Sequence, residues 1–374
     1  MMERRKNLND KFGFVDSMKI KDFIDYEQPN EYIVESDRYN IKYSTPVLTA
    51  GQSFILGYTN ESKGIYKKGP CIIFDDFTTS VHYVDFPFKV KSSAMKILTP
   101  KSNTDLKYCY YLLLSLSKMP PNHKRQWIST TSEKTHELPS MDKQIAIVKK
   151  LDLISDTIAI YTNQIENLDN LVKARFIEMF GDGNLPMKTV EELCSCVVDC
   201  PHTTPKYEGD LKNPAIRTSE IKKGFLVWDT MRYVSDKEYV ERTTRAIPKA
   251  GDIVYGREGT FGNAAILPDG YKFCLGQRVM LLRPDYSKCT SEYLLHSVIS
   301  DEVYRQAIEK NNASTVAHVN VKDVKQFKVP LPSLDKQNEF ANFVKQVDKS
   351  REAVKKSLEK TQQLYDSLMQ EYFG

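Results

Sequence analysis

The side chains that could do chemistry in this 374-residue chain lie on glycine- and proline-rich stretches, and they form no recognisable catalytic set. The phosphate-binding P-loop and the HExxH zinc motif are both absent, so the sequence carries no signature of an ATPase or a metalloprotease. An Asn/Asp-Pro-Pro-aromatic motif for base methylation and a Ser/His/Asp spacing are absent as well. The sequence therefore predicts a chain without catalytic residues, whose role is to recognise a partner molecule and not to catalyse a reaction on it.

One cluster has the residue types that bind zinc: Cys194, Cys196, Cys200 and His202. Their spacing is not that of a structural zinc site and no second cluster accompanies it, so we predict no metal. Seven cysteines with irregular spacing favour free thiols in a reducing cytoplasm. No run of 18 apolar residues and no apolar secretory core is present, so we expect a cytoplasmic protein without a membrane span.

A local excess of positive charge is the other feature with a chemical meaning. The chain holds 53 Lys and Arg against 49 Asp and Glu, a net charge of only +4. Residues 86–128, however, hold eight Lys or Arg and the single acid Asp105. Such a stretch suits a polyanionic partner, and a solvated basic surface explains the same charges equally well.

Two near-identical phrases open the elements that would position these groups. LPSMDKQ begins at Leu138 and LPSLDKQ begins at Leu331, 193 residues later. Each phrase precedes apolar residues spaced three and four apart, which is the heptad seam of a coiled coil. The first seam is Leu151, Ile154, Ile158, Tyr161, Ile165, Leu168 and Val172, and the second is Val344, Val347, Val354, Leu358, Tyr365, Leu368 and Tyr372.

The two seams predict long helices that pack against each other. Ser140 can cap the first helix and Gly181 can end it, which gives a helix of about 58 Å at roughly 1.5 Å per residue. Arg351 and Thr361 interrupt the second seam. Left unpaired, each helix would expose an apolar stripe at about 25 cal/mol per Å². Mutual packing is therefore favoured over the alternative of two unrelated surface helices.

The repeat extends, more faintly, into the segment before each helix. SSAMKILTP (92–100) is similar to QRVMLLRP (277–284). Strand-like runs separated by turns occur at 71–77, 82–90, 251–255 and 263–268. We predict an α+β chain with a mixed α/β domain at 1–137, a helix at 138–181, a second mixed α/β domain at 182–330 and a helix at 331–374. The order domain, helix, domain, helix can close into a ring. Such a circular repeat predicts antiparallel helices, a pseudo-twofold axis and one domain at each end of the helix pair.

This layout resembles the specificity subunit of type I restriction-modification systems over nearly the whole chain. A phrase such as LPSMDKQ opening a long helix is typical of that family's two conserved regions. TPVLTAGQSFILGYTNE (45–61) and IIFDDFTTSVHYVDFPFKVKSSAMKIL (72–98) are similar to one type of target recognition domain. DCPHTTPKY (199–207), GDIVYGREGTFGNAAILP (251–268) and LGQRVMLLRP (275–284) are similar to another. The family usually has Gly where Cys200 stands, which further weakens a zinc site.

The resemblance implies a DNA reader with no catalytic residue and no cofactor of its own. Two methyltransferase subunits, which bind S-adenosylmethionine, would grip the helical regions, and motor-nuclease subunits can join them. Each globular domain would read one half of a split, asymmetric double-stranded DNA sequence in which adenines are methylated. The helix pair would fix the number of unread base pairs between the halves, so a changed helix length should change that gap.

The candidate DNA contacts are side chains that fork toward base edges or neutralise phosphates. In the first domain, the glycine-punctuated polar stretch 51–68, which we predict to be a loop, carries Gln52, Ser53, Tyr58, Asn60, Lys63 and Lys67. The other first-domain candidates are Thr78, Thr79, Lys89, Lys91 and Ser92. In the second domain they are His202, Thr203, Thr204, Lys206, Tyr207, Arg217, Ser219, Arg257, Glu258, Thr260, Gln277 and Arg278. Asp75 and Asp76 fit turn caps as well as base contacts, and His202 fits a scaffold role as well as a contact.

Arg257→Ala is predicted to weaken or relax recognition in one half of the target only, as measured by methylation at both halves. Lys91→Ala is predicted to lower DNA affinity generally and to flatten its salt dependence, because a phosphate contact carries no base information. Unchanged methylation at both half-sites and unchanged affinity in Arg257→Ala would show that the assignment of the loop 256–262 to the DNA interface is wrong.

Two other classes of protein remain open on the sequence alone. The first is a stand-alone DNA-acting enzyme such as a nuclease, which assays of the purified chain for cutting or methyl transfer would detect. The second is a coiled-coil scaffold without a DNA role, which gel shifts with and without the methyltransferase would test. A specificity subunit of a nuclease-lacking or fused (IIB-like) methyltransferase system differs from the leading prediction only in its neighbouring genes.

Overall fold

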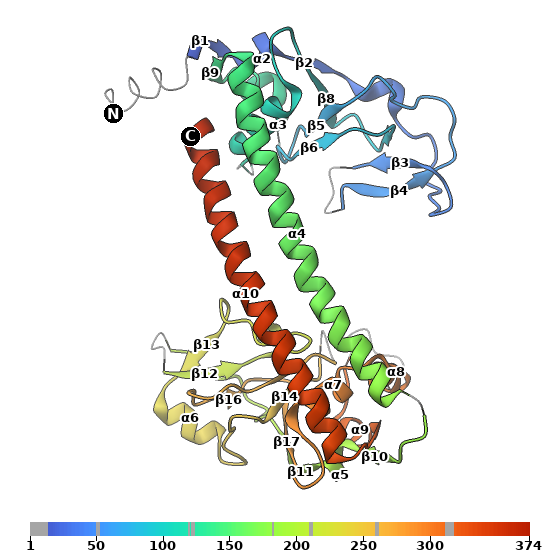
Figure 1. Ribbon diagram of the computed structural model, residues 1–374, viewed down its shortest axis with the longest axis vertical. Coiled ribbons are helices and arrows are strands. Elements are labelled where there is room, and N and C mark those ends of the chain that lie inside the picture. The colour runs from blue at the N-terminus through green and yellow to red at the C-terminus, as the bar shows by residue number, and fades with distance from the viewer. Residues whose placement is uncertain are drawn as a thin grey trace. The chain divides into compact units, whose positions relative to one another are not determined.

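The computed structural model describes residues 14–49, 53–118, 120, 124–181, 183–208, 212–258, 262–310 and 318–374. The chain forms two units: unit 1 is Met1–Thr162 with Lys356–Gly374, and unit 2 is Asn163–Lys355. Each unit contains a domain of strands and short helices together with part of both long helices, α4 and α10 (Figure 1).

Unit 1 is built on two sheets and one antiparallel pair of strands that lie far apart in the sequence. The four-stranded antiparallel sheet has the order β2 (Ile24–Glu27), β8 (Met95–Pro100), β5 (Cys71–Asp75) and β6 (Val81–Val84). The three-stranded sheet has the order β4 (Ile55–Thr59), β3 (Thr45–Leu48) and β7 (Lys89–Val90), and β1 (Phe14–Lys19) pairs with β9 (Thr135–Pro139). Its short helices are α2 (Ile20–Phe23), η1 (Pro29–Tyr32), α3 (Leu106–Leu116) and the π-helical turn η2 (Trp127–Thr131).

Unit 2 repeats this plan. Its four-stranded sheet has the order β11 (Cys194–Asp199), β17 (Val279–Pro284), β14 (Ile253–Gly256) and β15 (Ala264–Ile266). Its three-stranded sheet has the order β13 (Arg232–Val234), β12 (Asn213–Ile216) and β16 (Cys274–Leu275), and β10 (Met187–Thr189) pairs with β18 (Lys328–Pro330). Its short helices are α5 (Val190–Leu193), η3 (Thr218–Glu220), α6 (Asp236–Arg242), α7 (Ser291–Val298), α8 (Asp301–Lys310) and α9 (Val321–Lys325).

The two units share pairing directions as well as strand order. Both four-stranded sheets are antiparallel, and each three-stranded sheet contains one parallel pair, β3 with β7 and β12 with β16. The register places Lys96 of β8 opposite Phe74, as it places Met280 of β17 opposite Tyr255. The predicted internal repeat of two mixed α/β domains is therefore confirmed.

The central strands β5 and β14 are apolar on both faces because each is covered on both sides. In β5, Ile72 and Phe74 pack with Leu112 of α3, whereas Cys71 and Ile73 pack with Leu48 of the three-stranded sheet. In unit 2, Tyr255 of β14 likewise packs with residues of α7, and the neighbouring Val254 packs with residues of β12 and β16. Continuous apolar runs are the expected signature of such doubly covered strands.

The polar stretch 51–68, which the sequence predicts to be a loop, contains strand β4. Gly57 lies within this strand, and an added Cβ there would approach Tyr39 Cβ to 2.6 Å. This glycine therefore allows close packing and does not form a turn. Its presence is the reason that the prediction of a loop is wrong for this part of the stretch.

Helices α4 (Met141–Phe180) and α10 (Leu334–Phe373) are each 40 residues long and run antiparallel. In unit 1, Leu151 near the start of α4 packs in one cluster with Tyr372 near the end of α10. In unit 2, Val172 near the end of α4 packs with Phe340 near the start of α10. The seam residues are buried or half-buried, and Arg351, which interrupts the seam, donates to Asp169 of α4 at 2.8 Å.

The repeated phrase has a structural explanation in its last residue, a fully buried glutamine. The Gln144 side chain, 0% exposed, donates from Nε2 to the carbonyl oxygens of Asn103 (3.2 Å) and Pro139 (2.8 Å). Its Oε1 accepts the backbone N–H of Asp105, the N-cap residue of α3, at 2.8 Å. Gln144 thereby joins the first turn of α4 to the start of α3.

Gln337 does the same in unit 2. Its Nε2 donates to the carbonyl oxygens of Lys288 and Pro332, both at 3.0 Å, and its Oε1 accepts the backbone N–H of Thr290 at 2.9 Å. Thr290 is the N-cap residue of α7, the counterpart of α3. The glutamine of each phrase therefore fixes the long helix to the globular domain through backbone groups alone.

Candidate nucleic-acid interface

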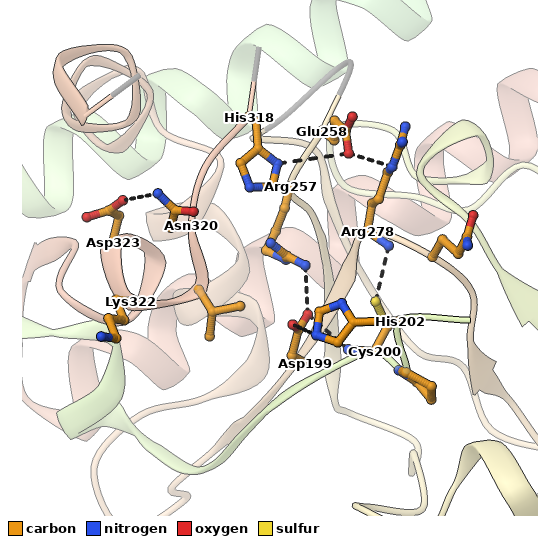
Figure 2. Close-up of a pocket in the computed structure, with 13 residues that line it drawn as sticks. Asp199, Cys200, His202, Arg257, Glu258, Arg278, His318, Asn320, Lys322 and Asp323 are labelled. Carbon is orange, nitrogen blue, oxygen red and sulfur yellow. Dashed lines mark hydrogen bonds and ion pairs between the residues drawn. The ribbon is translucent and has the colours of Figure 1, made fainter. Parts of the chain in front are cut away.

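Unit 2 contains a cavity of about 790 Å³ at which four separate segments of the chain converge (Figure 2). Its lining residues are Asp199, Cys200, Pro201, His202, Arg257, Glu258, Gln277, Arg278, His318, Asn320, Val321, Lys322 and Asp323. Of the second-domain candidates predicted from sequence, His202, Arg257, Glu258, Gln277 and Arg278 meet here. The segment 318–323 carries no signal in the sequence that would assign it to this site.

Arg257 lies at the base of this cavity with only 5% of its surface exposed. Its Nη2 donates to Asp199 Oδ1 at 2.8 Å and its Nη1 donates to the carbonyl oxygen of Val319 at 3.3 Å. Its backbone N–H donates to the carbonyl oxygen of Arg278 at 3.0 Å, and its own carbonyl accepts from Val319 N–H at 2.9 Å. Arg257 therefore holds β11, the 278 turn and the 318–320 segment together.

Arg278 occupies the rim of the same cavity, and its side chain is 60% exposed. Its backbone has φ = 64°, the left-handed conformation that non-glycine residues rarely adopt. The backbone N–H donates to Cys200 Sγ at 3.1 Å, and the Nε forms an ion pair with Glu258. Next to it, Gln277 Nε2 donates to Thr204 Oγ1 at 2.9 Å.

Arg242, which the sequence does not single out, organises the loop 201–207. Its buried guanidinium donates from Nε to the carbonyl oxygen of Leu275 at 2.9 Å and from Nη2 to that of Thr203 at 3.2 Å. The same residue faces Glu238, whose Oε1 accepts the backbone N–H of Lys206 at 3.3 Å. The loop and the 275–278 turn therefore share one buried anchor.

The other second-domain candidates divide between exposed and engaged side chains. His202 is largely exposed, with Nε2 3.5 Å from Asp199 Oδ2. The Tyr207 ring lies 5.9 Å from the Arg217 guanidinium and 5.0 Å from that of Arg232, and burial raises the pKa of its hydroxyl. Arg217 and Ser219 both donate to the buried carboxylate of Glu220. Thr260 lies outside the described residues.

Unit 1 has a cavity of about 680 Å³ beside β3 and β4, and three predicted residues line it: Tyr58, Asn60 and Lys67. Lys89 is buried instead, and its Nζ lies 2.8 Å from both Glu61 Oε2 and the carbonyl oxygen of Lys63. The Lys91 ammonium pairs with Asp37. Ser53 is exposed and lies in the chain just before β4. Gln52 lies outside the described residues.

The turn after β5 in unit 1 is the counterpart of the turn after β14 in unit 2. Asp76 N–H donates to the carbonyl oxygen of Ala94, as Arg257 N–H donates to that of Arg278. The Asp76 carboxylate is buried beside Lys96 at 3.0 Å, and its Oδ1 accepts the backbone N–H of Gln126 and Trp127. The first unit thus has an acid where the second has an arginine.

The other predicted residues at and near the unit 1 turn form hydrogen bonds within the protein. Asp75 Oδ1 accepts the backbone N–H and the hydroxyl of Thr78 at 2.6 and 2.7 Å, so this aspartate caps the turn. Thr79 has φ = 59° and donates from its hydroxyl to the carbonyl oxygen of Lys118 at 3.0 Å. Ser92 Oγ accepts Ala94 N–H at 3.3 Å.

Three points bear on other kinds of site. Within the ranges that the structure describes, no group of three His, Cys, Asp or Glu side chains is placed to hold a metal ion. Cys200 is instead a hydrogen-bond acceptor for the 278 turn, and all seven cysteines are free thiols. None of the described helices is both long and apolar enough to cross a membrane.

Comparison with known proteins gives concordant matches. The family model for the type I restriction modification DNA specificity domain matches residues 198–363. The specificity subunit of the type I restriction enzyme EcoR124I/EcoR124II from Escherichia coli is 31% identical over 358 residues, covering 89% of this chain and 87% of that protein.

Two solved structures share the fold. The S subunit of a type I restriction-modification system from M. genitalium has a TM-score of 0.61 at 14% identity, with 96% of each chain covered. A chain from a structural study of complex assembly and conformational transition of the type I R-M system has a TM-score of 0.51 at 15% identity. That match covers 94% of this chain and 97% of the other.

Proposed function

The chain belongs to the family of type I restriction-modification specificity subunits, and we propose that each of its units reads one half of a split, asymmetric sequence in double-stranded DNA. The observation that carries this proposal is the unit 2 cavity, where an exposed arginine, a glutamine and a glutamate stand together on anchored turns. These are the side-chain types that pair with guanine, adenine and cytosine edges.

The anchoring is as important as the residue types. Sequence readers need side chains held in a fixed geometry, because a base contact discriminates only when its donors and acceptors are pre-placed. In unit 2, the buried residues Arg242 and Arg257 supply that placement through hydrogen bonds to three carbonyl oxygens. In unit 1, Asp76 supplies it through two backbone N–H groups.

The internal repeat supports a pair of identical partners. Each unit presents the same arrangement of a long-helix start tied by a buried glutamine to the helix that follows its four-stranded sheet. Two like platforms on one chain suit two copies of one methyltransferase subunit, each of which would bind S-adenosylmethionine. In this proposal the chain supplies specificity in the cytoplasm, catalysis belongs to the methyltransferase, and motor-nuclease subunits join the same assembly.

The test is to express the chain with its cognate methyltransferase subunit and to map methylated adenines in the host DNA. We expect one split motif with two different halves, methylated only when both proteins are present. A methyltransferase that marks the same sites without this chain would overturn the proposal, as would methylation without any shared sequence.

A further inference from the structure

We propose that Arg278 is a specificity-determining residue of unit 2 and that it reads a guanine in one half of the DNA target. This inference rests on the proposed function and deepens it, because it assigns one base contact to one side chain. It also separates Arg278 from Arg257, the other arginine of the cavity, which positions the site and does not read bases.

The first argument is backbone strain at an exposed residue. Arg278 has φ = 64°, where a glycine would fit without steric conflict, yet the chain places a long arginine there. The preceding Gly276 is needed for packing, since an added Cβ would lie 2.4 Å from the carbonyl oxygen of Ile216. Strained residues that are held by surrounding structure cluster at functional sites, and no packing role explains a side chain that is 60% exposed.

The second argument is the rigidity of the turn that carries Arg278. Its N–H donates to Cys200 Sγ at 3.1 Å and its carbonyl accepts Arg257 N–H at 3.0 Å. The next residue, Val279, is the first of the buried strand β17. The Cα position of Arg278 is therefore fixed from both sides, while its exposed side chain lines the cavity beside Glu258 (Figure 2).

The third argument is the pairing of the guanidinium. Glu258, itself only 16% exposed, forms its ion pair with the Nε of Arg278. This ion pair engages the Nε, and the side chain that carries the two Nη groups is 60% exposed. That pair of donors matches the O6 and N7 acceptors that guanine presents in the major groove.

Arg257 lacks each of these properties. It is 5% exposed, and its two Nη groups donate to Asp199 and to the Val319 carbonyl oxygen. Its release toward DNA would leave Asp199 without its buried partner. The two arginines therefore have different tasks, although both stand in the same cavity.

The experiment compares the methylation motif of the complete complex with wild-type chain, Arg278→Gly, Arg278→Lys and the control Arg305→Ala. Arg305 is an exposed arginine on α8, paired with Glu302, so its loss removes one positive charge from the same unit. Arg278→Gly should fold with an equal or higher melting temperature, because glycine accepts the left-handed conformation. At one G·C pair of one half-site it should lose about tenfold to hundredfold of its discrimination.

Arg278→Lys should retain overall affinity and lose most of the same discrimination, since a lysine offers a point charge and no fork. The other half-site and the Arg305→Ala motif should match wild type. An unchanged motif in Arg278→Gly, an equal loss in both halves, or a clearly lowered melting temperature would overturn the inference while leaving the proposed function standing. A wild-type complex with no sequence motif would overturn the proposed function, and this inference with it.

Discussion

Replacing Gln337 by alanine is expected to lower the free energy of unfolding by about 3 kcal/mol or more. The substitution removes the partner of the Thr290 N–H and of the carbonyl oxygens of Lys288 and Pro332. Each unsatisfied buried group costs about 1–3 kcal/mol. The cavity left by a side chain that is 0% exposed adds to that loss. Denaturant unfolding and amide exchange at Thr290 would measure the effect.

The control for Gln337→Ala is Gln346→Ala on the same helix. Gln346 is exposed, so its truncation should change stability by less than about 0.5 kcal/mol. Gln144→Ala should reproduce the larger effect in unit 1, where the bonded groups are Asp105 N–H and two carbonyl oxygens. Equal melting curves for Gln337→Ala and Gln346→Ala would show that the repeated phrase has some other role.

Replacing Lys96 by methionine is expected to destabilise unit 1 by about 3–5 kcal/mol, because it leaves the Asp76 carboxylate buried without its counter-charge. The Lys96 and Asp76 side chains are 0% and 1% exposed, with Nζ and Oδ2 3.0 Å apart. Removing both charges, in Lys96→Met with Asp76→Asn, should recover part of the loss. Methionine is a natural occupant of this place in the fold, since Met280 stands at the matching register position in unit 2.

The matched control is Lys42→Met, an exposed lysine of the same unit. Urea unfolding of the wild-type protein, Lys96→Met, Asp76→Asn and the double variant would give the coupling between the two charges as a double-mutant cycle. A Lys96→Met protein no less stable than Lys42→Met would mean that the buried pair makes no net contribution. A double variant that is less stable than Lys96→Met would mean that Asp76 matters through its two backbone bonds alone.

The long helices could be predicted from sequence because their signal is local and repeated. Heptad spacing needs only neighbouring residues. The 193-residue offset between the two phrases also places Phe180-Gly181 on Phe373-Gly374, so the two helices have equal length. The doubly covered strands could be predicted for a similar reason, since an apolar run such as that of β5 carries its burial in its composition. Strand β4 could not, because Gly57 reads as a turn residue until Tyr39 is placed against it.

The site was harder to predict because residue type does not reveal which charges are buried. Lys89 and Lys91 stand two residues apart, yet only Lys89 is buried, against Glu61. Arg257 and Arg278 are chemically identical, and only the partners of each, far apart in the chain, separate an anchor from an exposed fork. Arg242 cannot be recognised from sequence, since it lies in a short polar helix whose composition is that of an ordinary exposed helix.

Asp76 in unit 1 and Arg257 in unit 2 carry opposite charges at matching turn positions. These charges limit which segments of the two units can be exchanged. Asp76 depends on Lys96, and Arg257 depends on Asp199, which lies on a different strand from the Lys96 counterpart. Suppose that only the turn after β5 replaced the turn after β14. The graft would place the carboxylate of Asp76 next to that of Asp199, and neither carboxylate would have a cation as its partner. New target specificities should therefore arise from this scaffold by exchange of whole units, or of a turn together with every strand that neutralises it.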